Sequence, residues 1–420
     1  MPAPIYLVLT AVVLIAAVTG NLPTSMVSGF TLTILLGGLF IWLGNLIPKV
    51  RDFGLPTILC TFGPATLIYF GLMPQPLIDV ATIFVAEQGF LDFFIVAIIA
   101  GSLLGMPRQL LMKAGPRFAA PLLGCIAVTF LVVGALSALF GQGFIEGILF
   151  VAAPAMAGGL GLGALPMSEM YAAQTGTDSG AFMGDLMSVV VIANIFCILI
   201  AGIYNALSKA RRQLFVGFNG YGQLMRVKGT AAELSLPEKR KASSFIALGQ
   251  GLLIAGGLFV LGELLGAYLT FMHPYAWTIV AAALVKIFSL LPQELENSTA
   301  DWGDMVNAVL VPALLVGVSI SYISIEEVLA SLTNPLFIVL TAASVVLATV
   351  SSGLIGWLLK FNFVEVSITP GLVMADTGGS GDVAVLSAAD RLHLMPFAAL
   401  STRLGGAVVL FVTSFLVQFL

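Results

Sequence analysis

Long apolar runs recur along this chain and limit what it can fold into. Of its 420 residues, 59% are hydrophobic and 9% are charged, and the mean hydropathy is +1.08. An ordinary soluble domain carries about 25% charged residues, so this chain lacks the polar surface that water requires. Apolar runs of roughly 17–25 residues have the length of a helix that crosses a bilayer. The sequence therefore predicts an all-α polytopic membrane protein surrounded by membrane lipid.

We predict eleven transmembrane helices from the apolar runs. The first run has no basic segment before it and no clear cleavage site after it, so we interpret it as a retained helix rather than a signal peptide. The predicted spans lie near residues 4–20, 25–47, 53–73, 91–112, 118–141, 180–205, 245–271, 275–292, 305–323, 336–359 and 396–418.

Basic residues predict the orientation, because short cytoplasmic loops collect Lys and Arg. Lys and Arg occur in the loops after spans two, four, six and ten, and they are densest after span six. The loops after spans one, three and seven contain neither residue type. We therefore expect the N-terminus inside the cell. With eleven spans, the C-terminus then lies outside.

Several other classes of protein are disfavoured. The net charge of −4 is confined to loops and makes no field that attracts nucleic acid. Cys60, Cys125 and Cys197 lie in apolar runs without metal-binding spacing, so we expect neither a disulfide nor a cysteine-bound metal. We see no Ser/His pair, no HExxH motif and no paired intramembrane aspartates. We therefore expect no enzyme and no catalytic residues.

Two stretches do not fit as single spans. By the count of spans, residues 146–176 begin and end outside, whereas residues 363–395 begin and end inside. Both stretches are rich in glycine and interrupted by proline. Irregular backbone at membrane depth is stable only where it is buried in protein or lines a wet cavity. We therefore predict two re-entrant hairpins that form part of a pathway.

The two hairpins occupy matching positions in two units of opposite orientation, and each carries a GGxG element, at residues 158–161 and 378–381. Glycines in membrane helices often serve only close packing. Interrupted segments at matching positions of inverted repeats instead indicate a secondary transporter, whose exposed backbone amides can hold an anion. The predicted units are an extra helix at 1–20, a first repeat at 21–205, a solvated cytoplasmic linker at 206–244 and a second repeat at 245–420.

Arg403 is predicted well inside the last span. An intramembrane arginine costs about 3 kcal/mol or more to insert and faces a cavity or a partner. Its guanidinium either grips a substrate carboxylate or pairs with Asp382 or Asp390. Asp376 is a candidate cation ligand, because carboxylate oxygens and the free carbonyls of a broken helix suit hard cations. Asp382 is alternatively a helix cap.

The residues also carry a resemblance to a known family. The segments are "GLPTILCTFGPATLIYFGL", "AGGLGLGALPMSEMY", "GGSGDVAVLSAADRLHLMPFA" and "STRLGGA". They resemble the 2-hydroxycarboxylate transporter family, the bacterial sodium-coupled citrate and malate carriers. The resemblance implies sodium symport of a malate-like or citrate-like 2-hydroxy di- or tricarboxylate by an elevator mechanism. It also implies a homodimer with eleven spans and two re-entrant hairpins in the bacterial cytoplasmic (inner) membrane.

The resemblance further implies the positions of two sites. Its substrate site corresponds to Gly161, Gly379, Ser380 and Arg403 of this chain, together with position 160. Its sodium sites, for Na+ as the coupling ion and with no organic cofactor, correspond to Met374, Asp376 and Thr402.

This chain departs from the citrate carriers at three of the family's positions. Leu160 and Asp376 each stand where asparagine is usual, and Thr377 stands where some members have a second arginine. Fewer donors and one less positive charge should hold a tricarboxylate poorly. The identity of the substrate therefore stays open. The alternative to sodium symport is a proton-coupled or exchanging carrier of another organic anion.

Overall fold

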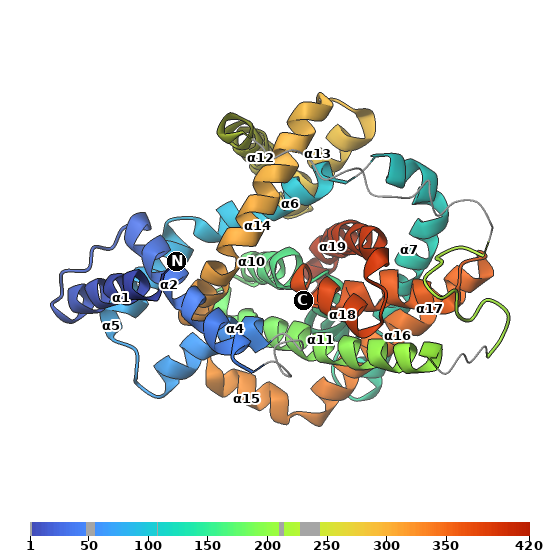
Figure 1. Ribbon diagram of the computed structural model, residues 1–420, viewed down its shortest axis with the longest axis horizontal. Coiled ribbons are helices and arrows are strands. Elements are labelled where there is room, and N and C mark those ends of the chain that lie inside the picture. The colour runs from blue at the N-terminus through green and yellow to red at the C-terminus, as the bar shows by residue number, and fades with distance from the viewer. Residues whose placement is uncertain (1, 48–54, 107, 210–213, 227–243) are drawn as a thin grey trace.

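The computed structural model describes residues 2–47, 55–106, 108–209, 214–226 and 244–420, and the regular structure in these residues is helical (Figure 1). The only extended pairing within these ranges is a single antiparallel bridge between Met225 and Phe361. The predicted all-α architecture is confirmed.

The labelled helices differ widely in length, and π-helical or 3-10 turns interrupt several of them. They are α1 (Ala3–Val18), α2 (Met26–Asn45), α4 (Leu55–Tyr69), α5 (Gln75–Thr82), α6 (Phe90–Leu104), α7 (Arg108–Leu139), α8 (Phe144–Gly147), α9 (Ala153–Met156), α10 (Leu165–Thr175), α11 (Gly180–Lys209), α12 (Phe245–Tyr268), α13 (Pro274–Phe288), α14 (Gln293–Tyr322), α15 (Ile325–Thr333), α16 (Pro335–Leu358), α17 (Phe363–Val366), α18 (Ser380–Ala388) and α19 (Met395–Leu416).

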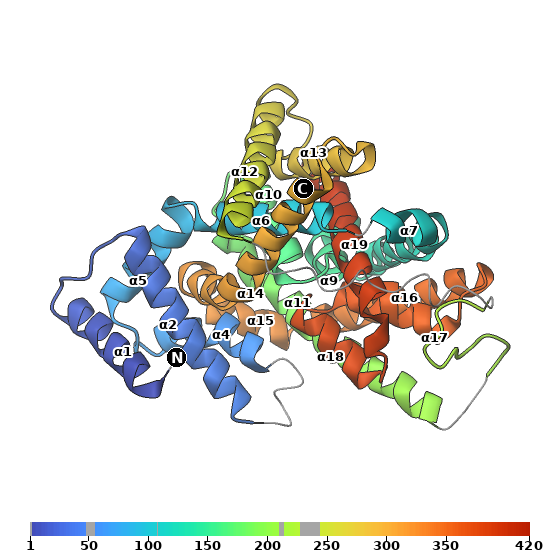
Figure 2. The same cartoon turned by 45° about the horizontal axis from the view of Figure 1, so that its top comes forward.

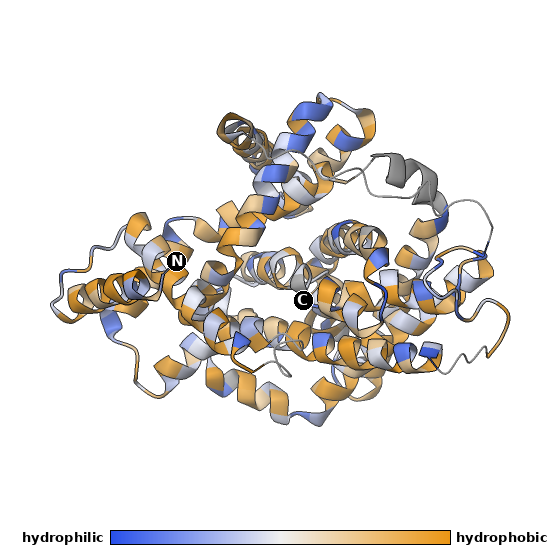
Figure 3. Cartoon of the chain, viewed as in Figure 1, coloured by the Kyte–Doolittle hydropathy of each residue, from blue (hydrophilic) through white to orange (hydrophobic). Residues whose placement is uncertain are grey.

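Seven helices in the described residues are long and apolar enough to cross a membrane, or eight if one bent pair counts as a single span. The bent pair joins Gln75–Glu87 to Phe90–Leu104 at 48°. Apolar residues also cover outward faces of the molecule (Figure 3). On α12, for example, Phe245 is 93% exposed and Leu253 is 75% exposed, as expected for side chains that face lipid. The finer count of eleven spans stays a prediction.

Three helical segments differ from the expected spans. The helix over Gln75–Glu87 and the short α15 were not expected, and α14 begins at Gln293 rather than near residue 305. Hydropathy misses the first turns of α14 because they are acidic. One of these carboxylates is neutralised inside the fold, since Glu296 pairs with Lys286 of α13 at 2.7 Å and both side chains are 4% exposed.

The helices pack in two groups with few contacts between them. We call α2, α4, α5, α6, α12, α13 and α14 the framework group, which occupies the left and top of Figure 1. We call α7 to α11 and α16 to α19 the hairpin group. Its helices α7, α16 and α17 lie to the right in Figure 1 and keep that place when the molecule is turned (Figure 2). Long helices such as α7 and α16 pack along each other within this group.

The described part of the predicted linker, residues 214–226, contacts the second predicted hairpin on one side and is exposed on the other. Residues 214–226 lie against the start of α17, where the amides of Phe363 and Val364 donate to the carbonyls of Gly217 and Phe218, each at 2.9 Å. Phe218 is 3% exposed. Backbone pairing and an aromatic contact hold this part against α17, while Val216 and Tyr221 are 84% and 53% exposed. The linker at 206–244 stays a prediction. Residues 210–213 and 227–243 lie outside the described residues.

Candidate functional site

Each predicted hairpin is a helix broken at its GGxG element. In the first segment, α9 ends at Met156 and the helix resumes at Leu160. In the second, a 3-10 turn ends at Ala375 and α18 begins at Ser380. Proline lies in each segment before the break, where the missing amide and the ring favour irregular π-helical turns.

The two breaks meet. The amide of Gly158 donates to the carbonyl of Met374 at 3.1 Å. A Cβ on Gly378 would lie 2.6 Å from the carbonyl oxygen of Gly158, and one on Gly159 would overlap the Thr377 backbone. Gly159 and Gly378 also have φ of 106° and 70°, which side chains disfavour. Glycine is therefore required where the two segments touch.

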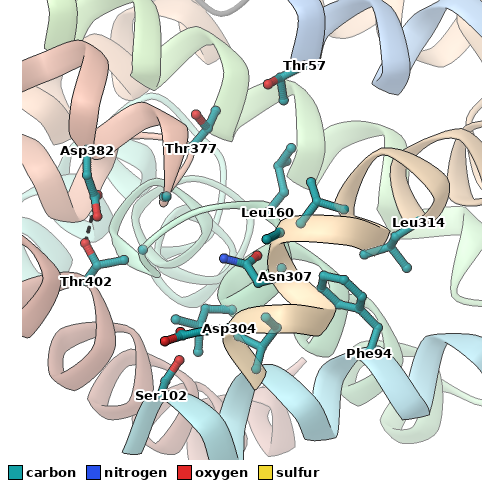
Figure 4. A pocket seen from close by; sticks show the side chains of 18 of the residues that line it. Thr57, Phe94, Ser102, Leu160, Asp304, Asn307, Leu314, Thr377, Asp382 and Thr402 are labelled. Atoms are coloured by element: carbon teal, nitrogen blue, oxygen red, sulfur yellow. Dashed lines mark hydrogen bonds between the residues drawn. The ribbon is translucent and has the colours of Figure 1, made fainter. Parts of the chain in front are cut away.

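A cavity of about 520 Å³ lies beside this junction. Figure 4 shows its lining, which comes from both helix groups, and the hydrogen bond between Asp382 and Thr402. The hairpin group contributes Gly158, Leu160, Gly161, Leu162, Thr377, Gly378, Gly379, Asp382, Thr402 and Arg403, and the framework group contributes Thr57, Phe94, Ser102, Gly303, Asp304 and Asn307 among others.

The substrate residues expected from the resemblance mostly line this cavity. Gly161, Gly379 and Arg403 lie on its wall, and Leu160 adds an apolar patch in place of a hydrogen-bond donor. Ser380 begins α18 beside them, but its side chain lies outside the described residues. The structure thus brings together positions that lie more than two hundred residues apart in the chain.

Arg403 pairs with a residue that the sequence analysis did not consider. Its Nη2 donates to Oδ1 of Asp304 on α14 at 3.1 Å. Among the described residues its salt-bridge partner is therefore Asp304, rather than Asp382 or Asp390. Gly105 at the end of α6 makes room for the guanidinium, because a Cβ there would lie 3.0 Å from Nη1. No local sequence signal connects positions 304 and 403, which lie on different helices.

The residues expected to hold sodium lie close to one another. The Asp376 side chain is buried, and its Oδ1 accepts the Gly378 amide at 2.6 Å. Its Oδ2 is buried without a hydrogen-bond donor among the described residues. Thr402 Oγ1 donates to Asp382 Oδ1 at 3.0 Å. An unpaired buried carboxylate oxygen is the kind of ligand that a hard cation such as Na+ takes.

Asp376 and Asp382 form a pair that the sequence analysis missed. Both residues are buried, and their carboxyl groups lie near enough to each other to interact electrostatically. The expectation that no paired intramembrane aspartates exist is therefore wrong. Between the two positions the chain makes a tight turn, in which the Gly381 amide donates to the Gly378 carbonyl at 2.8 Å and Gly378 and Gly379 have positive φ.

Asn194 of α11 is a further polar contact at the junction. Its side chain is 3% exposed, and its Oδ1 accepts the Thr377 amide at 3.2 Å. Asn194 therefore fixes the backbone of Thr377, the residue at the position where some citrate carriers have a second arginine. An asparagine inside the apolar run of α11 is the sequence signal that could have indicated it.

A family model decides what kind of protein carries this site. The model of the 2-hydroxycarboxylate transporter family matches residues 1–415. The chain belongs to this family. The resemblance seen in the sequence is confirmed.

Curated members of the 2-hydroxycarboxylate transporter family match this chain over nearly its whole length. The citrate transporter CitP of Leuconostoc mesenteroides subsp. mesenteroides is 33% identical over 99% of this chain and 92% of its own length. The Na(+)-malate symporter and the citrate/malate-proton symporter of Bacillus subtilis (strain 168) are 32% and 30% identical, each over 100% of this chain and 92% of its own length.

Membership in the 2-hydroxycarboxylate transporter family settles the broad class. The family and these relatives are transporters, not enzymes. With its several membrane-capable helices, the chain is a multi-pass membrane protein. The relatives' names include citrate and malate, and both sodium and proton.

Proposed function

We propose that this protein is a secondary active transporter that carries a 2-hydroxycarboxylate together with sodium. The observation that carries the proposal is the cavity at the meeting point of two broken helices, with a guanidinium on its wall. Broken helices expose amides and carbonyls, so one junction can hold an anion and a cation together. Its volume of about 520 Å³ is within the range of small-molecule sites.

The proposed substrate contacts divide by chemistry. Arg403 offers a planar fork to one carboxylate. The backbone amides at Gly161 and Gly379, with the Ser380 hydroxyl, hold the rest of the anion. The side chains of Leu160 and Thr377 carry neither the amide nor the positive charge that citrate carriers have at these positions. We therefore propose that the site holds a malate-like dicarboxylate in preference to citrate.

The proposed cation site consists of Met374, Asp376 and Thr402. The orphaned Asp376 Oδ2 supports it, because an unpaired buried carboxylate oxygen is costly without a cation or a proton. A relative named as a sodium symporter agrees with this. Proton coupling is the second candidate, since two neighbouring buried carboxyls can hold a proton in place of a cation and another relative is named as a proton symporter.

We further propose re-entrant hairpins, inverted repeats at 21–205 and 245–420, a cytoplasmic N-terminus and an external C-terminus. Two contacts support opposite entry of the hairpins. The predicted cytoplasmic linker packs on the start of α17, whereas α10 of the first segment contacts the turn at Val417–Phe419 near the C-terminus. Movement of the hairpin group against the framework group, in a homodimer of the bacterial inner membrane, would give alternating access.

Uptake into proteoliposomes tests the proposal. Labelled L-malate, citrate and L-lactate are compared in sodium buffer and in choline buffer, each with and without a proton gradient. We expect saturable uptake of malate that requires Na+, and Asp376→Ala should raise the Na+ concentration needed for half-maximal uptake by at least tenfold. Full uptake in choline buffer driven by the proton gradient alone would overturn sodium coupling and favour the proton-coupled alternative.

A further inference from the structure

The ion pair between Arg403 and Asp304 joins the two helix groups. Arg403 belongs to α19 of the hairpin group, and Asp304 belongs to α14 of the framework group. Both residues line the cavity. The pair therefore lies at the proposed substrate space.

Asp304 presents to Arg403 the same chemical group that the substrate would bring. A carboxylate oxygen accepts one hydrogen bond from Nη2, at 3.1 Å. The Asp304 side chain is 59% exposed and that of Arg403 is 27% exposed, so water reaches the pair. Solvent-exposed ion pairs of this kind are weak, so another anion can replace Asp304 as the partner of Arg403.

Asp304 is not alone on its side of the cavity. Asn307 lies three residues further along α14, on the same helix face, and Figure 4 shows both side chains directed into the cavity. The Nδ2 atom of Asn307 lies 3.9 Å from the position that a Cβ on Gly379 would occupy. The framework group thus offers one carboxylate and one amide to the space in front of the second break.

We propose that Asp304 occupies Arg403 in the empty carrier and that a substrate carboxylate displaces it. The proposal rests on the proposed role of Arg403 as the substrate fork. Displacement releases a link between α14 and α19, so substrate binding also removes one of the contacts that join the hairpin group to the framework group. The displaced Asp304 and the nearby Asp382 leave negative charge in the cavity, which selects against anions with additional carboxylates.

Asp304→Asn tests this role with nearly the same shape and no charge. Binding of L-malate and citrate to the full-length protein in detergent is measured by calorimetry at saturating Na+. We expect the dissociation constant for malate to fall about two- to fivefold, the size expected when a weak competing ion pair is removed. The gain for citrate should be larger, because citrate carries more negative charge. Glu294→Gln, an exposed charge on the same helix away from the cavity, should change neither value.

Two further measurements separate the possible outcomes. An unchanged or increased dissociation constant in both Asp304→Asn and Asp304→Ser, with unaltered melting temperatures, would overturn the proposal. If Arg403→Lys leaves malate affinity unchanged, the proposed substrate site itself fails. If Arg403→Lys weakens malate binding and Asp304→Asn does not strengthen it, the proposed substrate site stands and only the proposed displacement of Asp304 by the substrate is wrong. In proteoliposomes, Asp304→Asn should also raise net efflux relative to exchange, because the empty carrier has lost its link.

Discussion

Arg403 is the side chain on which the substrate proposal depends most. It lies in an apolar helix, contacts Asp304 across the cavity and is the proposed anion fork. Arg403→Lys keeps the charge but loses the parallel donors, so we expect substrate affinity to fall about 30- to 150-fold, or roughly 2–3 kcal/mol. Calorimetry with L-malate measures the affinity. A lowered melting temperature of the ligand-free protein with unchanged affinity would instead show that the arginine is structural.

Gly159 allows the two broken helices to touch. Its φ of 106° and the adjacent Thr377 backbone exclude a side chain. Gly159→Ala should therefore separate the segments and abolish malate binding. Gly176→Ala is the matched control, because Gly176 has φ of 70° but no atom within 4 Å of a Cβ. It should lower the melting temperature slightly and preserve binding. Equal loss of binding in both variants would show that strain, and not contact between the segments, is responsible.

The second broken helix is held at its base by an ion pair that also holds the linker. Glu365 is fully buried and accepts the amides of Gly220 and Gly222 at 2.8 Å each. Its Oε1 also lies 3.5 Å from Nε of Arg391, at the other end of the same segment. Glu365 therefore joins both ends of the segment to the linker.

Removing that carboxylate should loosen the base of the segment. Glu365→Ala leaves the buried Arg391 without its carboxylate, and breaking a buried pair in this way costs about 3–5 kcal/mol. We expect a clear drop in the melting temperature of the detergent-solubilised protein. Glu326→Ala, an exposed acidic residue on α15, should change it little. A similar small effect in both variants would mean that the linker contacts are dispensable.

The molecule as a whole consists of two helix groups that share one cavity. If transport requires the hairpin group to move against the framework group, a covalent link between the groups should stop it. The amide of His273, before α13, donates to Ser414 Oγ of α19 at 2.9 Å, so these positions are close enough for a cross-link. His273→Cys with Ser414→Cys should lose malate exchange on oxidation and regain it on reduction.

A cross-link inside one group provides the control. Asn205 Nδ2 of α11 donates to the Ala388 carbonyl of α18 at 2.8 Å, and both helices belong to the hairpin group. Asn205→Cys with Ala388→Cys should keep exchange when oxidised. The native cysteines Cys60, Cys125 and Cys197 are buried and should not interfere. Exchange that persists in the oxidised His273/Ser414 variant would argue against movement of the two groups.

The helical architecture and the positions of the helix breaks could be predicted from the sequence, because both depend on local chemistry. A run of apolar residues has to form a helix in lipid wherever it lies in the fold, so the all-helical architecture followed from composition. The breaks at residues 157–159 and 376–379 followed from glycine and proline, which interrupt a helix whatever surrounds them. The polar first turns of α14 and the amphipathic α15 were not predicted, because a search for long apolar runs does not detect helical segments that carry charged residues.

Pairing between distant segments was decided only by the tertiary structure. That the carbonyl of Met374 accepts the Gly158 amide, or that Arg403 meets Asp304, depends on how whole helices pack, and no local pattern carries that information. The Asp376 and Asp382 carboxyls come near each other because a tight turn at the break lies between them. Local residue types therefore determined where this protein is helical and where its helices break, whereas packing decided which atoms face the cavity, because side-chain neighbours across helices are a property of the whole fold.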